Sequence, residues 1–365
     1  MRHTSGDKIF FGLVCAIALI GIAIYSSASL GLLARQSGSL SRDILLQSTL
    51  GLGLGFVALF AIRSMPLEWA KRGAPYVFVG TLLFTMLVFV PGIGFRSGGA
   101  TRWINLGFTT LQPAEFLKIG FVLLVAWWLS PRARQLKDPR QGLIPLVLML
   151  GLPAVVLLMQ PNTSTTMLLC LTGVAMYVAA GAPWRDLAIV GALALTVLAG
   201  LLLFRPYALE RFKTYMNPTD NALGSGYQIQ QSMLAIGSGG MTGRGFGQGV
   251  GKFNYLPEPS GDSVFAVFAE ETGFFGSVFL LCLLVGLAAR GITISGHARD
   301  LFGGLVAFGF SSLILIQVFI NVSAMLGIIP LTGLPLPFVS HGGTALLAVL
   351  IMCGFILNVA SHKKA

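Results

Sequence analysis

Two adjacent acids, Glu270 and Glu271, lie a short way into a long apolar run that follows the most polar stretch of this chain. A third acid, Asp262, stands just before that apolar run. If the run is helical, Glu270 lies about 12 Å deeper than Asp262, because a helix rises about 1.5 Å per residue. Carboxylates at two depths of a membrane would suit a substrate that is part polar and part lipid.

Asp262 can be interpreted in two ways. The ordinary role for an isolated Asp before an apolar run is that of a helix N-cap. The sharper alternative is a general base, because a carboxylate beside apolar surface binds protons more tightly and can then accept one from a sugar hydroxyl. Glu270 and Glu271 are costly in hydrocarbon unless they are paired, so we expect an Arg, a Lys or a bound cation beside them.

A second charged pair occurs where Pro113 begins another apolar run. Glu115 and Lys118 are three residues apart and therefore share one helical face. Spacing alone favours a pair that neutralises itself inside the membrane. The functional alternative is a lysine directed at phosphate and held in place by Glu115. Arg102, beside Trp103, is first interpreted as a solvated charge next to an interfacial anchor.

Three loops carry further polar groups. In QPNTST (160–165), Asn162 is a good N-cap, and its neighbours offer oxygens to a hard cation as a weaker alternative. The glycine-dense stretch 237–251, with Arg244 and Lys252 nearby, favours close packing over a phosphate site lined by backbone N–H groups, and it is not a Walker A loop. Three prolines make 330–344 an irregular segment.

The elements that must position these residues are membrane spans. Hydrophobic residues make up 55% of the chain, charged residues 10%, and the mean hydropathy is +0.82, which is typical of a polytopic membrane protein. Apolar runs long enough to cross roughly 30 Å of hydrocarbon occur at 9–27, 46–62, 74–92, 113–130, 143–160, 164–181, 186–204, 263–289, 301–327 and 341–360. The sequence predicts an all-α fold of ten transmembrane helices in a single domain, 1–365, whose first helix is retained.

The basic residues orient these helices. Fourteen Lys and Arg residues fall on one side, and the short loops of the other side hold four. Because basic loops remain in the cytoplasm, both termini are predicted to be cytoplasmic, and the loops 91–112, 205–262 and 328–340 face outward. The long outer loop 205–262 lies between helices 7 and 8. The segment 98–118 is too polar to span and is expected to form a surface or re-entrant hairpin.

Composition also excludes some classes of function. The net charge of +11 follows from the topology of the loops, so no nucleic-acid partner is indicated. The four cysteines lie singly in apolar runs and the four histidines form no zinc pattern, so no protein-held metal site is predicted.

Five blocks of this sequence, in order and between the expected spans, resemble the SEDS family of bacterial cell-wall polymerases, which includes RodA, FtsW and SpoVE. The resemblance covers nearly the whole chain. The blocks are GATRWINLG with QPAEFLK, QPNTST, NPTDNALGSGYQIQQSMLAIGSGG, LPEPSGDSVFAVFAEETG and PLTGLPLPFVSHGGT.

The resemblance implies a peptidoglycan glycosyltransferase of the bacterial cytoplasmic membrane that polymerises lipid II at the outer face. Asp262 matches the essential loop aspartate of the family and would act as the base. Arg102, Lys118 and Arg211 would stabilise the undecaprenyl pyrophosphate that leaves, and Glu115 would orient Lys118. The remaining residues assigned to the substrate are Arg244, Lys252, Glu258, Glu270, Glu271, Ser340 and His341. A divalent cation, Mg²⁺ or Mn²⁺, is an open alternative to these basic groups.

Some positions depart from the pattern of the family. Asn162 and Ser164 stand where a charged cation ligand and its neighbour are usual, and His341 replaces a more frequent Tyr. GDSVFAVFAEE is closer to FtsW-like members, whereas the short termini are closer to RodA, and we favour the FtsW-like branch slightly. The expected partners are lipid II, undecaprenyl-pyrophosphate-linked glycan, membrane lipid and a class B penicillin-binding protein. A lipid II flippase and a scaffold for the transpeptidase are the alternative functions.

Overall fold

Long apolar helices dominate the computed structural model, which describes residues 7–35, 51–97, 100–105, 110–204, 206–217 and 225–362. Each of the ten predicted spans coincides with a helix, although residues 46–50 of the second span lie outside the described residues. These helices are α1 (Lys8–Arg35), α3 (Leu54–Ser64), α4 (Leu67–Met86), α5 (Pro113–Leu129), α6 (Leu143–Met159), α7 (Thr163–Ala179), α8 (Trp184–Phe204), α12 (Val264–Gly296), α13 (Leu301–Met325) and α14 (Gly343–Ser361).

Six of the described helices are long and apolar enough to cross a bilayer by length and composition. The helices α5, α6 and α7 each have 17 residues, or about 25 Å at 1.5 Å per residue, which is less than the hydrocarbon thickness of a typical bilayer. The chain is therefore a helical, multi-span membrane protein. The count of ten spans and the cytoplasmic termini stay predictions.

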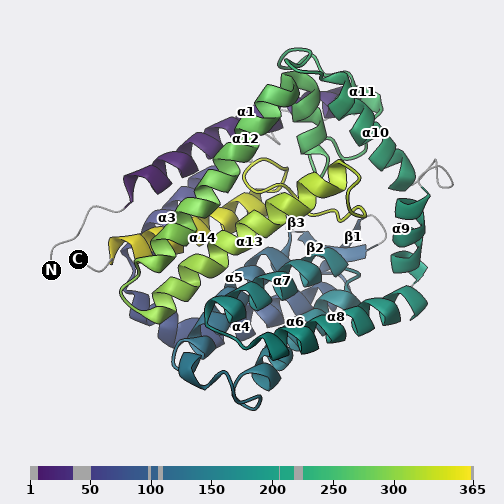
Figure 1. Ribbon diagram of the computed structural model, residues 1–365. Coiled ribbons are helices and arrows are strands. Elements are labelled where there is room, and N and C mark those ends of the chain that lie inside the picture. Colours follow the sequence, from purple (N-terminus) through teal and green to yellow (C-terminus); the bar gives the residue numbers. More distant parts are fainter. Residues whose placement is uncertain are drawn as a thin grey trace.

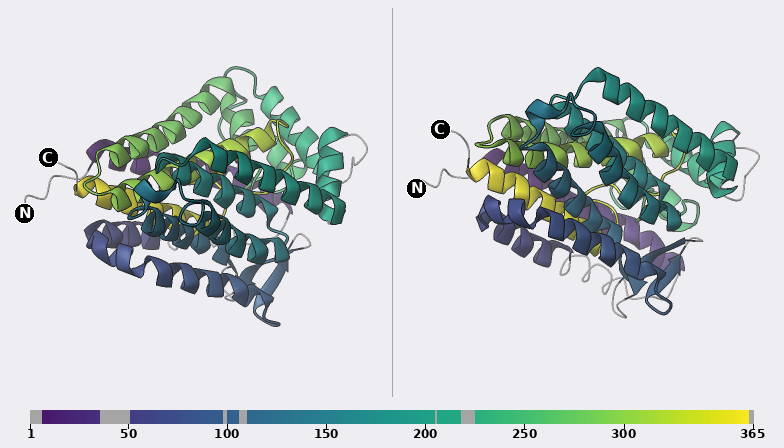
Figure 2. Two further views of the ribbon diagram at one scale, coloured as in Figure 1. Left: turned by 60° about the horizontal axis from the view of Figure 1, so that its bottom comes forward. Right: turned by 90° about the horizontal axis from the view of Figure 1, so that it is seen from below.

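The helices α13 and α14 form the centre of the bundle. Within their most apolar windows 78% of the residues are buried, compared with 6% for α8. Figures 1 and 2 accordingly show α13 and α14 enclosed by other helices and α8 at the margin. A helix that is apolar all round and enclosed by neighbours can present its few polar side chains only to protein.

The start of α1 and the end of α14 lie at one end of the bundle, and the longest connections lie at the other (Figure 1). The connection 205–262 contains α9 (Pro206–Met216), α10 (Ser225–Ser238) and α11 (Gly251–Asn254). Single turns of 3-10 helix occur at Leu87–Phe89 and Ala133–Gln135. The polar groups predicted to face outward are thus gathered at the end of the bundle opposite the two terminal helix ends.

The predicted all-α fold also has a small sheet. Strands β1 (Gly94–Ser97), β2 (Ala100–Asn105) and β3 (Thr110–Leu111) form an antiparallel sheet in the order β1-β2-β3. Within the expected hairpin at 98–118, the described residues up to Leu111 belong to β2 and β3, and α5 begins at Pro113. The segment ATRWIN contains Thr101, Trp103 and Ile104, and β-branched and aromatic residues of this kind favour a strand.

Candidate active site

Asp262 lies immediately outside α12, at the loop end of the bundle. The N-cap of α12 is Ser263, so the predicted capping role of Asp262 is wrong by one residue. The half-buried carboxylate accepts a hydrogen bond at Oδ1 from Gln228 Nε2 of α10, 3.1 Å away. The main-chain carbonyl of Asp262 accepts a hydrogen bond from Asn321 Nδ2 of α13 at 2.9 Å. Side chains from two other helices therefore fix this residue.

The surroundings of Asp262 raise its pKa to about 6, well above the ordinary value of an aspartate. Burial is the main cause, because it disfavours the charged carboxylate, and the negative charge of Glu258 adds to it. Hydrogen bonds from the backbone and from Gln228, and the positive charge of Arg211, act in the opposite direction. A pKa near 6 allows Asp262 to be ionised at neutral pH and still to bind a proton, as a general base must.

The last loop, 330–342, packs beside Asp262 and is held by side chains from other elements. Arg211 of α9 donates to the carbonyl of Leu331 at 2.9 Å, and Ser164 of α7 donates to the carbonyl of Thr332. A Cβ atom placed on Gly333 would lie 3.8 Å from Asp262 Oδ2, so the loop forms one wall of the space around the carboxylate.

Ser340 and His341 lie at the end of this loop, and both make contacts that hold the loop in place. Ser340 Oγ accepts a hydrogen bond from the N–H of Leu336 at 2.7 Å. The N–H of His341 donates to the carbonyl of Ser260 at 2.6 Å, and the His341 ring lies 5.7 Å from that of Tyr25. Through these contacts the last loop is fastened to the segment that carries Asp262.

The predicted pair of Glu115 and Lys118 is confirmed. Lys118 Nζ lies 2.6 Å from Glu115 Oε2, and both side chains are buried. Lys118 also donates to Gln317 Oε1 of α13 at 3.0 Å, and Gln317 Nε2 donates to the carbonyl of Pro335 at 2.8 Å. The cation of α5 is therefore connected through Gln317 to the same loop that borders Asp262.

Arg102 on β2 contacts the hairpin between α6 and α7. Its guanidinium donates to the carbonyls of Gln160, at 3.3 Å, and Pro161. Asn162 in the same hairpin accepts a hydrogen bond from the N–H of Thr165 at 3.3 Å, which confirms the predicted N-cap of α7. The assignment of Arg102 to the substrate stays a prediction.

A buried ion pair lies where the glycine-rich stretch meets α12. Lys252 Nζ lies 2.6 Å from Glu271 Oε1, and the two side chains are 0% and 1% exposed. Lys252 also donates to Ser27 Oγ of α1 and to the carbonyl of Gly247, while Ser27 donates to Glu271. The expected cationic neighbour of Glu271 is thus confirmed, and it is supplied from within the chain.

Glu270 holds the glycine-rich stretch through its backbone. Its carboxylate accepts from the N–H groups of Val250 at 3.0 Å and Gly251 at 3.1 Å, and Arg244 lies 3.4 Å from it. These N–H groups form the kind of concave site that binds anions, and here the anion is a side chain of the protein. The packing interpretation of the glycines agrees with these contacts.

The helix α12 is kinked at the point where this stretch docks. Gly273 has a φ of 67°, which favours glycine, and the N–H of Phe274 next to it donates to the carbonyl of Gly240 at 2.9 Å. The glycine-rich stretch therefore replaces part of the hydrogen bonding that the kink removes from the helix.

All of the predicted site residues except Arg102, which contacts the hairpin between α6 and α7, fall into two groups. Asp262, Glu258, Arg211, Ser340 and His341 gather around the last loop, to which Gln317 connects Glu115 and Lys118. Arg244, Lys252, Glu270 and Glu271 instead fasten the glycine-rich stretch to α12.

The sequence analysis missed Gln228, Gln317 and Asn321. The last two are polar side chains four residues apart in a predicted span, and that spacing was a signal that could have identified them.

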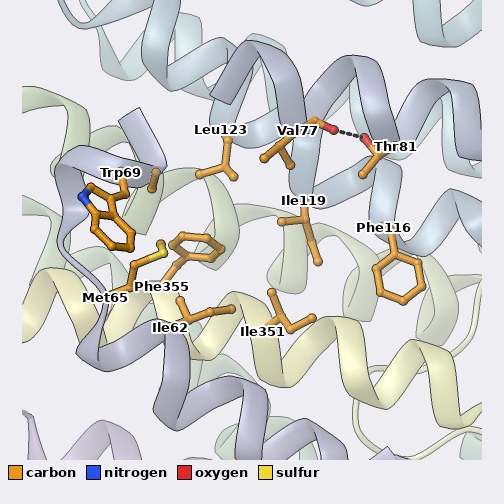
Figure 3. Close-up of a pocket in the computed structure, with 11 residues that line it drawn as sticks. Ile62, Met65, Trp69, Val77, Thr81, Phe116, Ile119, Leu123, Ile351 and Phe355 are labelled. Atoms are coloured by element: carbon orange, nitrogen blue, oxygen red, sulfur yellow. Dashed lines mark hydrogen bonds between the residues drawn. The ribbon is translucent and has the colours of Figure 1, made fainter. Parts of the chain in front are cut away.

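An apolar pocket of about 320 Å³ opens between α3, α4, α5 and α14 (Figure 3). It extends from Met65 and Trp69 to Phe116, and Phe116 and Ile119 of α5 adjoin Glu115 and Lys118 in the chain. The hydroxyl of Thr81 in its wall donates to the carbonyl of Val77 at 2.9 Å, so little polar surface faces the pocket. Such a lining suits a hydrocarbon chain.

The donor set for a divalent cation is small. In the described part of the chain, no group of three or more His, Cys, Asp or Glu side chains is arranged to hold a metal ion. Asp262 and Glu258 are the carboxylates near the last loop, and Glu115, Glu270 and Glu271 are engaged by basic side chains. Mg²⁺ usually takes one or two protein carboxylates and completes its shell with substrate phosphates and water, so an ion at the last loop would depend on Asp262, Glu258 and substrate oxygens.

Comparison with known proteins places the chain in a family. The model of the FtsW, RodA and SpoVE family, described as cell cycle protein, matches residues 7–365. Stage V sporulation protein E of Bacillus subtilis is 34% identical over 363 residues, which cover 100% of this chain and 99% of that protein. A probable peptidoglycan glycosyltransferase FtsW of a Geobacter species is 32% identical over 365 residues, with 100% and 99% covered.

Solved structures agree with the sequence comparisons. A chain from a study of the structural coordination of polymerization and crosslinking by a peptidoglycan synthase complex matches with a TM-score of 0.80 and 29% identity, over 98% of both chains. The rod shape determining protein RodA of Thermus thermophilus matches with a TM-score of 0.71 and 28% identity, over 99% of this chain and 98% of that chain. This chain therefore belongs to the FtsW, RodA and SpoVE family of multi-pass proteins of the bacterial cytoplasmic membrane.

Proposed function

We propose that this chain is a peptidoglycan glycosyltransferase that polymerises lipid II at the outer face of the membrane. The observation that carries the proposal is the half-buried carboxylate of Asp262, with a pKa of about 6, in a loop cluster that also connects to Lys118 and contains Arg211. The name of the FtsW relative supports the reaction class.

In the proposed reaction, Asp262 accepts the proton of the 4-hydroxyl of the acceptor N-acetylglucosamine. The oxygen then forms a bond to the anomeric carbon of the donor N-acetylmuramic acid, with inversion. The bond from that carbon to the diphosphate oxygen breaks, and undecaprenyl pyrophosphate leaves with the electron pair. A base held by other helices contributes most when the acceptor lies within hydrogen-bond reach, typically 10²- to 10⁴-fold in rate.

The leaving diphosphate needs positive charge in a medium of low dielectric constant. Lys118 is fully buried and Arg211 is half-buried, so water screens both only weakly. Each already holds a fixed position through its contacts with Gln317 and the last loop. Preorganised cations of this kind stabilise charge as it develops, without reorganising during the reaction.

The apolar pocket beside α5 gives the undecaprenyl tail a place to bind. Phe116 at one end of this pocket is two residues from Lys118 in the chain, and apart from Thr81 the lining side chains are apolar. A lipid bound there would project its diphosphate toward Lys118. This arrangement explains how a chain with so little aqueous surface can bind a lipid-linked sugar.

A class B penicillin-binding protein is the proposed partner. The support is the likeness to a chain from a peptidoglycan synthase complex that coordinates polymerization and crosslinking. The use of a divalent cation stays a prediction, and we propose no step through one because the donor set near Asp262 is small.

The experiment compares polymerisation with transport. The purified chain is reconstituted with its transpeptidase partner in liposomes that contain labelled lipid II, and glycan strands are resolved on gels with and without EDTA. We expect strands to form. Movement of labelled lipid II between leaflets without any polymer would support a flippase instead. Loss of activity in EDTA that Mg²⁺ or Mn²⁺ restores would support a cation requirement.

A further inference from the structure

Two buried amides lie on one face of α13. Gln317 and Asn321 are four residues apart, and each is 1% exposed in the most enclosed part of the bundle. A buried amide is costly in an apolar environment unless its polar atoms are bonded. The partners of these two side chains therefore indicate what they stabilise.

Gln317 joins a cation to the last loop. Its Oε1 accepts from Lys118 Nζ at 3.0 Å, and its Nε2 donates to the carbonyl of Pro335 at 2.8 Å. Asn321 makes the equivalent connection for the base. Its Nδ2 donates to the carbonyls of Leu334, at 2.7 Å, and Asp262, at 2.9 Å. The two amides thus hold consecutive carbonyls of one loop.

The orientation of Asn321 follows from these contacts. Two carbonyl oxygens can be satisfied only by the NH₂ group, so Oδ1 points the other way. Oδ1 is buried, and among the described residues it has no hydrogen-bond donor. Asn321 therefore places its NH₂ group on the two loop carbonyls while its own acceptor oxygen has no donor among the described residues.

We propose that Gln317 and Asn321 are positioning residues that hold Lys118 and Asp262 in a fixed relative arrangement through the carbonyls of Leu334 and Pro335. The inference rests on the proposed function, in which Asp262 acts on the acceptor sugar while Lys118 stabilises the leaving diphosphate. The two events occur in one transition state, and a displacement of about 1 Å at either group can cost about 10²-fold in rate.

The first test uses kinetics. Asn321→Ala and Gln317→Ala are each expected to lower kcat for glycan polymerisation about 10- to 100-fold, with KM for lipid II within about twofold of the parent. In the double variant the losses are expected to be less than multiplicative, because both side chains hold one loop. Ser312→Ala is the matched control, since Ser312 is buried on α13 but bonds only to the carbonyl of Gly309 in its own helix. Parental kcat in both single variants would overturn the proposal.

The second test does not depend on polymerisation. A carbodiimide labels protonated carboxyl groups, so labelling of Asp262 against pH, read by mass spectrometry, gives its titration midpoint. The charged groups that act on Asp262 are Glu258 and Arg211. Asn321→Ala frees Asp262 toward water and should lower the midpoint, whereas Asn321→Asp adds a negative charge and should raise it.

The two tests separate the two claims. A parent that makes no glycan would contradict the proposed function, and the labelling midpoints would still decide the positioning role. Midpoints that are the same in the parent, Asn321→Ala and Asn321→Asp, in proteins with unchanged thermal unfolding, would overturn the positioning role even if the parent polymerises lipid II.

Discussion

The carboxyl group of Asp262 has two charged neighbours that act on it in opposite directions. Glu258 raises its pKa, and Arg211 lowers it. Burial is the largest cause of the raised pKa, the charge of Glu258 adds to it, and the resulting pKa is about 6. A base works only when ionised, so polymerisation is expected to fall as the pH is lowered through about 6 and to be maximal above it.

The fall in rate at low pH forms the acid limb of the pH–rate profile. Neutralising either neighbour of Asp262 should shift this acid limb in a known direction. Glu258→Gln removes a negative charge, stabilises the ionised form of Asp262 and should shift the limb to lower pH. Arg211→Gln removes a positive charge and should shift it to higher pH. The measurement is the initial rate of glycan synthesis between pH 4.5 and 8, with Lys213→Gln, an exposed position on the same helix as Arg211, as control. Shifts of the same sign in both variants would contradict this account.

Gly333 is the residue of the last loop that borders the carboxylate. Gly333 has a φ of 68°, a backbone conformation that costs an alanine about 1–2 kcal/mol. The methyl group added by an alanine would lie 3.8 Å from Asp262 Oδ2. Gly333→Ala should therefore lower both the thermal unfolding temperature and kcat. Gly286→Ala in α12 is the control, because a Cβ there meets open space. A Gly333→Ala protein with parental kcat would show that this wall does not shape the site.

Among the elements, the glycine-rich stretch and α12 depend on the buried pair of Lys252 and Glu271. Replacing Lys252 by Met leaves Glu271 buried without its cation, which typically costs about 3–5 kcal/mol. The unfolding temperature in detergent should fall clearly. Arg72→Ala is the matched control, because Arg72 and Glu68 form an exposed pair whose loss should leave that temperature unchanged. Equal effects of the two changes would contradict a stabilising role for the buried pair.

The elements also show which parts of the site could be predicted from the sequence. Two contacts could be predicted from local spacing alone, because each joins residues that are three apart in the sequence. They are the ion pair of Glu115 and Lys118 and the cap that Asn162 provides for α7. For Glu270 and Glu271 only the need for a cation could be predicted. Which cation each one meets depends on how a long loop returns to α12, and local pattern carries no information on that.

Neutral amides were the main omission. Gln317 and Asn321 carry no charge, so the rule that charges within a membrane need partners does not identify them. Their partners are main-chain carbonyls of a proline-rich loop, and no sequence pattern reveals which carbonyls a buried amide will meet. Strands β1, β2 and β3 were likewise not predicted, because a polar segment between two apolar runs indicates a hairpin without fixing its secondary structure.

At the scale of the whole molecule, the site must combine polar groups at the loop end of the bundle with an apolar surface on its side that binds lipid. In our account, the apolar pocket between α3, α4, α5 and α14 is this lipid-binding surface. Thr81→Trp would fill the pocket and is expected to raise KM for lipid II several-fold with a smaller change in kcat. Tyr76→Trp is the control, because Tyr76 lies on the same helix, is 80% exposed and does not line the pocket. An unchanged KM in the Thr81→Trp variant would show that the pocket does not bind the lipid tail.

The positions of the apolar helices were the most predictable feature of the molecule, because hydropathy is a local property and the bilayer fixes the length of each apolar run. The arrangement of the helices was not predictable in this way, since it depends on contacts between distant segments. Only that arrangement shows that Asp262, Arg211 and Lys118 share one loop as a neighbour.

The most direct test of the central claim is the polymerisation rate of Asp262→Asn at neutral pH, measured with purified lipid II beside the parent. The amide is nearly the same size as the carboxylate but accepts no proton, so we expect the rate to fall at least about 100-fold while the unfolding temperature stays close to that of the parent. An Asp262→Asn protein that forms glycan strands at the parental rate would contradict the assignment of Asp262 as the base.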